Sequence, residues 1–127
     1  MRVTITSVVN PRSGQVAFHT EFGTGVGEWV GELPSIGEYR DVEFTVDEPV
    51  ASGRTLVALQ PQDRPFITHT AEGVTLMGQL ERNEADGVAV IRLGSSLLMV
   101  EFDGDAVAAP SWVQIGPVRI RLYDTNA

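Results

Sequence analysis

The side chains best able to carry acid–base or metal chemistry are few and scattered along the chain. His19 and Glu21 lie two residues apart in an alternating segment, residues 15–22, so they share one face of a predicted strand. A histidine beside a carboxylate can move a proton or provide half of a metal site. The other histidine, His69, has only threonine neighbours, and the chain has no cysteine. Because chemistry needs several convergent groups, we interpret His19 as a surface histidine and predict no catalytic or metal-binding residue.

Two short motifs resemble ligand-binding loops, but each lacks the parts that make such loops work. Asp103-Gly104-Asp105 offers the closely spaced carboxylates that Ca²⁺ prefers, yet residues 106–109 add no oxygen-bearing side chain. The glycine-rich residues 22–27 resemble a phosphate loop, yet a strand is predicted after them and the chain has no lysine. We therefore predict two turns, the second a flexible hairpin. No serine lies beside a plausible base, so we predict neither a cofactor nor an enzyme.

The charge balance limits the partners that the protein can bind. Nine arginines, no lysine and seventeen acids give a net charge of -8. A chain this acidic is repelled by phosphate backbones, so we do not expect it to bind nucleic acid. No apolar run reaches the roughly 18 residues that cross a bilayer, and residues 1–6 alternate where a signal peptide would be continuously apolar. Together with the lack of cysteine, this predicts a cytoplasmic protein that contacts no membrane.

Alternation of apolar and polar residues is the main structural signal. It predicts strands with one buried face at 3–9, 15–22, 28–33 and 42–48, and again at 74–80, 87–93, 97–102 and 118–124. The two sets agree in order, spacing and turn chemistry, which predicts an internal duplication. We divide the chain into a first β repeat (1–50), a linker that could hold an extra strand (51–72, with the strand at 54–59) and a second β repeat (73–127). Together they are expected to form one compact globular unit.

Several details extend this match between the repeats. Ser7 and Gly78 place a small residue at corresponding inward positions, where a strand can bend sharply or cross another closely. Residues 87–93 are apolar on both faces, so this strand should be the more buried of its pair. Residues 34–37 and 110–116 are interpreted as connections that lead into the last strand of each repeat.

These patterns predict an all-β fold, in which internally duplicated units of four to five strands form tandem barrels or one compact barrel or sandwich. Such a unit, with a short connection before its last strands, resembles half of a tandem oligonucleotide/oligosaccharide-binding (OB) barrel. With the segments EWVGELP at 28–34 and GPVRIRLYDTN at 116–126, the chain also looks like small bacterial proteins of unassigned function. The resemblance implies OB-like barrels and carries no activity. The helix that such barrels have between their third and fourth strands has no counterpart here.

Acidic residues around the third and fourth predicted strands could bind a basic partner. Trp29 stands among acids and could anchor that partner, as large aromatic residues do at interface centres. The alternation favours the other arrangement, in which Trp29 packs inward with Leu33. The predicted partner-binding residues are Glu28, Trp29, Glu32, Asp41 and Glu43.

The last strands of the two repeats carry charges of opposite sign. Asp41, Glu43 and Asp47 would face outward in the first repeat, and Arg119 and Arg121 in the second. Matched potentials could pair the repeats or two protomers, although ordinary surface charge gives the same pattern. We predict Arg119 and Arg121 as self-association residues, and both a monomer and a homo-oligomer stay open.

Three functions of different classes fit the sequence. The first is a non-enzymatic acidic binding protein, similar to an immunity or inhibitor protein that masks a basic toxic partner. The second is an OB-like module for an oligosaccharide or single-stranded nucleic acid, of which the nucleic acid is disfavoured by the charge. The third is a structural or self-assembling β subunit that adds to other sheets through exposed strand edges.

Overall fold

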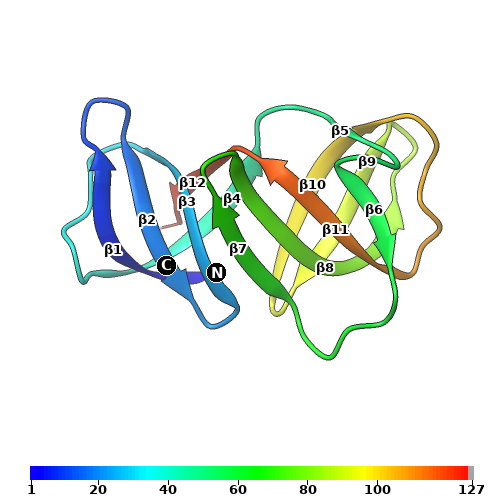
Figure 1. Ribbon diagram of the computed structural model, residues 1–127, viewed down its shortest axis with the longest axis horizontal. Coiled ribbons are helices and arrows are strands. Elements are labelled where there is room, and N and C mark those ends of the chain that lie inside the picture. The colour runs from blue at the N-terminus through cyan, green and yellow to red at the C-terminus, as the bar shows by residue number, and fades with distance from the viewer. Residues whose placement is uncertain (126–127) are drawn as a thin grey trace.

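The alternating segments form strands, and the part of the chain that the computed structural model describes, residues 1–125, contains no helix (Figure 1). The predicted all-β class is therefore confirmed. Nothing in these residues could cross a bilayer as a helix. The strands are β1 (Arg2–Asn10), β2 (Gln15–Thr20), β3 (Gly23–Val30), β4 (Tyr39–Val46), β5 (Val50–Ala51), β6 (Leu56–Leu59), β7 (Phe66–Thr70), β8 (Gly73–Asn83), β9 (Val88–Leu93), β10 (Ser96–Asp103), β11 (Ser111–Val118) and β12 (Ile120–Asp124).

Five of these strands close into a barrel in the order β12-β4-β1-β2-β3. The ring closes because β12 pairs with β4 in antiparallel fashion on one side and with β3 in parallel fashion on the other. Ile120 and Leu122 of β12 point into this barrel and are buried. Gly27 of β3 allows the close approach of β12, since a Cβ atom at this position would lie 3.0 Å from the carbonyl oxygen of Ile120.

The other strands curl into a second unit around the long strand β8. One edge of β8 pairs with β7 and then with β9, and the other edge pairs with β11. β10 lies between β9 and β5, β11 pairs with β6, and a bridge between Ser52 and Leu56 joins the end of β5 to β6. The close crossing predicted at Gly78 is confirmed, because a Cβ there would lie 2.6 Å from the carbonyl oxygen of Arg92.

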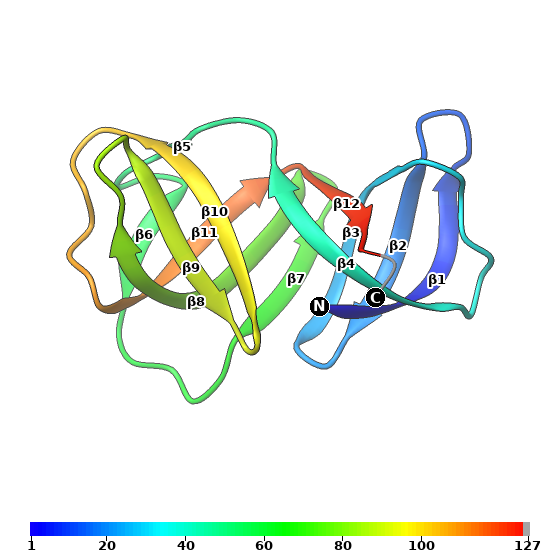
Figure 2. The same ribbon diagram turned by 180° about the vertical axis from the view of Figure 1, so that it is seen from behind.

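Each unit takes strands from the other part of the chain. β12 follows β11 of the second unit but closes the first barrel, whereas β5 and β6 follow β4 of the first barrel but lie in the second unit. Figures 1 and 2 show β12 among β1–β4, and β5 and β6 beside β9–β11. The parallel pair β10–β5 corresponds to the parallel pair β3–β12. The two units are therefore connected by two crossing segments.

The structure corrects the interpretation of residues 110–116 as a connection. Residues 111–118 form β11, which lies antiparallel to β8 as β4 lies antiparallel to β1. Residues 118–124 are therefore not the spatial counterpart of 42–48: β12 and β4 are neighbours in one barrel. The prolines at both ends of β11 looked like loop residues, although Val113 and Ile115 point inward in strict alternation. The hairpin predicted at residues 22–27 turns at residues 21–22 instead, and residues 23–27 belong to β3.

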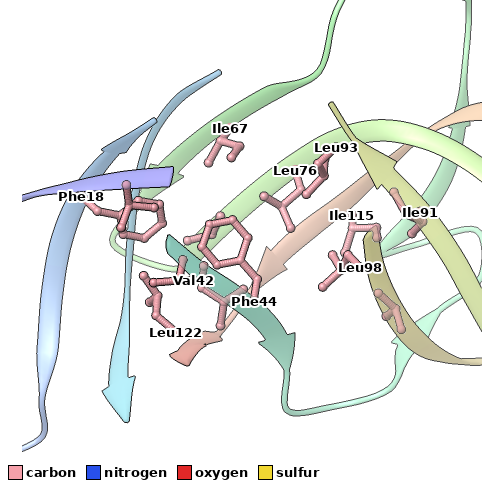
Figure 3. Packing of buried hydrophobic residues seen from close by; sticks show 14 of the residues in the cluster. Phe18, Val42, Phe44, Ile67, Leu76, Ile91, Leu93, Leu98, Ile115 and Leu122 are labelled. Carbon is pink, nitrogen blue, oxygen red and sulfur yellow. The ribbon is translucent and has the colours of Figure 1, made fainter. Parts of the chain in front are cut away.

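The buried side chains of the two units form one continuous cluster (Figure 3). Phe44 of β4 lies between the barrel residues Val42 and Leu122 and the second-unit residue Leu98 in this view, and its ring centroid is 5.5 Å from that of Phe18. β9 is buried on both faces, as predicted for residues 87–93. β7 adds a direct link, because the Ile67 amide donates a hydrogen bond to the carbonyl oxygen of Phe22 at 2.9 Å.

The exchange of strands predicts that the two units unfold together. Replacing the buried Leu122 by Ala should lower the free energy of unfolding by about 2–5 kcal/mol, because it leaves a cavity in the barrel wall. Urea denaturation followed by the fluorescence of single-tryptophan variants reports on Trp29 in the first barrel and Trp112 in the second unit. Both probes should shift to the same lower midpoint.

The matched control is Leu97→Ala, which removes the same atoms from an exposed position and should cost less than about 1 kcal/mol. Two well-separated midpoints, with only Trp29 sensitive to Leu122→Ala, would show that the units unfold independently.

Candidate functional site

A polar groove of about 700 Å³ lies at the junction of the two units. It runs beside β3 and the start of β12, and the turn between β7 and β8 forms its other wall. The polar side chains that line it include Ser13, Gln15, Glu28, Asp47, Glu72, Arg119 and Arg121. We call this hollow the polar groove. It contains charges of both signs and no aromatic side chain.

Arg121 is held inside the polar groove by neighbouring acids. Its Nε atom lies 3.3 Å from a carboxylate oxygen of Glu28 and 3.2 Å from one of Asp47. Hydrogen bonding to Tyr123, followed by the negative charges of Asp47 and Glu28, raises the pKa of Arg121. The opposite charges expected on equivalent surfaces of two repeats therefore meet within one barrel, because β12 pairs with both β3 and β4.

Arg119 differs from Arg121 in having no such partners. Its side chain is exposed, and it makes no ion pair within residues 1–125. Its neighbour on the second wall of the groove is Glu72, which also lacks an ion pair among the described residues. Of the two predicted self-association residues, only Arg119 is free to reach a second molecule.

Trp29 is buried, with 4 % of its surface exposed, so it cannot anchor a partner. The alternative that it packs inward is confirmed. Arg40 lies over its ring at 5.7 Å from the centroid and is ion-paired with Glu38 at 2.6 Å and with Asp124 of β12. Hydrogen bonds to Glu38 and then Asp124 raise the pKa of Arg40, and its hydrogen bond lowers the pKa of Glu38. This cluster ties the end of β12 to β4.

A second hollow of about 350 Å³, the apolar groove, lies between β4 and the β9–β10 hairpin. Figure 2 shows β4 and β10 side by side at this junction. The groove is lined mainly by apolar side chains, among them Met1, Val42, Phe44, Leu93, Leu97 and Leu98, and by Glu43. Along the outer face of β10, Leu97 is 46 % exposed and Met99 is 61 % exposed. These two side chains extend an apolar surface beyond the groove.

Two of the predicted partner-binding acids, Asp41 and Glu43, lie on β4 beside this surface, and Glu101, which was not predicted, lies on β10. Glu43 is exposed at the groove and has no ion pair in the described chain. Asp41, two residues earlier on β4, lies 3.6 Å from Arg2. Glu101 follows Met99 on the outer face of β10 and is exposed. Glu28 belongs to the polar groove instead, and Glu32 is exposed after the end of β3, so the structure does not gather the five predicted residues into one site.

The histidines and the aspartate turn form no reactive centre in the described chain. His19 pairs across the strands with Thr24, and Thr24 Oγ1 lies 3.4 Å from Nδ1 of His69. No hydrogen bond or ion pair joins His19 to Glu21 within residues 1–125. Asp103 and Asp105 are exposed, and no group of three or more histidine or acidic side chains in this range could hold a metal ion.

Sequence reasoning missed the exposed apolar residues of β10. Leu97 and Met99 occupy alternate positions, as do the buried Leu98 and Val100. Residues 97–100 form a continuous apolar run, which predicts a strand but not which of its faces is exposed to solvent. The alternation does not reveal that Leu97 and Met99, on the outer face of β10, stay exposed among residues 1–125.

The two arginines of β12 should respond differently to charge reversal. Arg121→Glu places a third carboxylate beside Glu28 and Asp47, so we expect a lower melting temperature that added salt partly restores. Arg119→Glu should leave the melting temperature nearly unchanged. If self-association occurs, sedimentation should show that Arg119→Glu alters it. Equal melting temperatures for both variants would contradict the inferred role of Arg121.

No protein-family model, no curated protein and no solved structure matches this chain. A function must therefore be argued from the charges, exposures and contacts of its own residues.

Proposed function

We propose that the protein is a non-enzymatic binding protein that docks a basic protein partner on the apolar groove and the adjoining face of β10. The observation that carries this proposal is the exposure of Leu97 and Met99 beside Glu43 and Glu101. Exposed apolar side chains that adjoin one another and are bordered by polar residues are typical of interaction sites. Leu97 and Met99 thus form an apolar centre, and Glu43 and Glu101 give it a negatively charged border.

Charge supports a basic partner over other classes of protein. The chain has a net charge of -8, and Glu43 and Glu101 make no ion pairs in the described residues. Such free carboxylates attract a positively charged surface over a distance of about one Debye length, roughly 8 Å at physiological salt. They therefore speed the encounter, while burial of the apolar side chains slows dissociation.

An inhibitor-like role fits this arrangement. A protein that masks a basic toxic enzyme needs a rigid surface of complementary charge and no catalytic group of its own. Here β4 and β10 belong to different units that are joined by exchanged strands, which fixes the groove between them. The lack of cysteine fits a reducing compartment, and we propose the cytoplasm.

An OB-like ligand site is the second candidate, and one observation favours it. The order β1-β2-β3-β12-β4, with β3 and β12 parallel, supports the proposal that the first barrel is OB-like. OB folds bind ligands across their second and third strands and the adjoining loops. The polar groove occupies this place, with Ser13, Gln15 and Glu28 in its lining. Its lack of aromatic residues removes the stacking on which single-strand binding depends, so we rank this candidate second.

The proposal predicts salt-sensitive binding that depends on the apolar groove. In titration calorimetry against a panel of purified basic nucleases and a panel of acidic ones, only basic members should bind. In a kinetic measurement such as stopped flow, the association rate should fall steeply with added salt. Combining Glu43→Gln with Glu101→Gln should slow association about tenfold or more. Leu97→Ser should instead speed dissociation.

The matched control is Glu21→Gln, which removes one exposed carboxylate from the turn after β2 and should leave both rates nearly unchanged. Binding that all three changes weaken equally would indicate unspecific attraction to an acidic protein. Failure of every basic protein to bind would contradict the proposal.

A further inference from the structure

The outer face of the second unit carries two rows of side chains that line up across neighbouring strands. In the first row Trp112 of β11 lies opposite Leu59 of β6 and opposite Gln79 of β8. In the second row Gln114 lies opposite Val57 and Met77. Phe66 of β7 extends this row because it pairs with Met77. Since Val113 and Ile115 point into the core, Trp112 and Gln114 must point outward.

The side chains of these two rows are uncharged in a strongly acidic protein. None of the seven residues in the two rows can ionise: Leu59, Gln79 and Trp112 in the first, and Val57, Phe66, Met77 and Gln114 in the second. Four of the five glutamines of the chain lie on or beside it, because Gln60 and Gln62 follow directly after β6. The nearest charge in the register, Arg92 opposite Gln79, is ion-paired with Glu81.

A pocket of about 420 Å³ opens beside Trp112 on this face. It is lined by Leu59, Pro61, Gln79, Pro110, Ser111 and Trp112. Its volume lies within the roughly 300–1,000 Å³ that is usual for small-ligand sites, and its mixture of apolar walls and a few polar groups is usual as well. The hydroxyl oxygen of Ser111 is buried and has no hydrogen-bond partner among the described residues.

We propose that this face, centred on Trp112 and Gln79, binds a neutral oligosaccharide. A pyranose ring presents an apolar side of C–H groups that can lie on an indole ring, and hydroxyl groups that both donate and accept hydrogen bonds. A glutamine amide has two donors and an acceptor, which suits such hydroxyls. Gln79 lies directly opposite Trp112, and Gln114 lies one row further along β11, so a sugar unit on the indole has amides on the same sheet face.

The charge distribution separates this ligand from other classes. A nucleic acid would need several free basic residues, whereas Arg92, the arginine next to Gln79 in the register, is ion-paired with Glu81. A basic protein would be drawn to the exposed acids on β4 and β10 instead. The site thus lies on strands other than those of the proposed protein-docking surface, and it does not depend on that proposal.

Titration with cellohexaose, maltohexaose and chitohexaose tests the proposal on the full chain. At least one of these neutral sugars should change tryptophan emission in a saturable way, and the change should come from Trp112, because Trp29 is buried beneath Arg40. The affinity should be the same at about 50 mM and about 500 mM salt, since no charged contact is involved.

Three variants distinguish a binding role from a structural one. Trp112→Ala and Gln79→Ala should each weaken the affinity in calorimetry, the former about tenfold or more, while Trp112→Phe keeps an aromatic surface and should retain part of it. The control is Tyr39→Ala, which removes an exposed aromatic residue from β4 and should leave sugar binding unchanged.

Absence of binding to all three sugars would overturn the proposal, as would binding that survives both Trp112→Ala and Gln79→Ala. A dimer in sedimentation that Trp112→Ala converts to a monomer would also overturn it, because a second copy of the chain would then cover this face.

Discussion

The structure depends on the pairing of β12 with both β3 and β4. Ile120 and Leu122 fill the barrel from this strand, and its backbone groups satisfy those of two neighbours. Without β12 the first barrel would have two unpaired strand edges and an open core, which is costly for an isolated sheet. Because β12 comes from the far end of the chain, the first barrel is complete only when the second unit has been made. In the same way, the second unit needs β5 and β6, which follow β4 of the first barrel in the chain.

This exchange also explains why the candidate sites lie where they do. The polar groove takes Glu28 from β3, Arg121 from β12 and Glu72 from the turn after β7. The apolar groove takes Glu43 from β4 and Leu97 from β10. Each groove therefore needs both units, and strands that cross between the units hold its walls at a fixed separation. A rigid site of this kind loses little conformational entropy on binding.

The sequence predicted most of the strands because they carry their own apolar–polar patterns, but it missed β7 within the predicted linker and β11 within the predicted connection. Which strands pair is a property of residues far apart in the chain, and there the prediction failed. Residues 118–124 alternate like residues 42–48, but alternation cannot tell an equivalent strand from an adjacent one. The same error misplaced Arg121, whose partners Glu28 and Asp47 became visible only once β12 lay between β3 and β4. Trp29 was predictable, since its inward position follows from the alternation alone.

The distribution of charge gives the molecule two surfaces of different chemistry. Glu43 and Glu101 face solvent on β4 and β10, whereas Trp112 and Gln79 face solvent on β11 and β8. The rows around Trp112 hold no ionisable side chain, and the charges that border them, Arg92 and Glu81, are paired with each other. Solubility does not explain such a surface, because charged side chains on an outer sheet face would serve it better. An uncharged ligand explains such a surface, because its binding displaces no ions and buries the apolar area around Trp112.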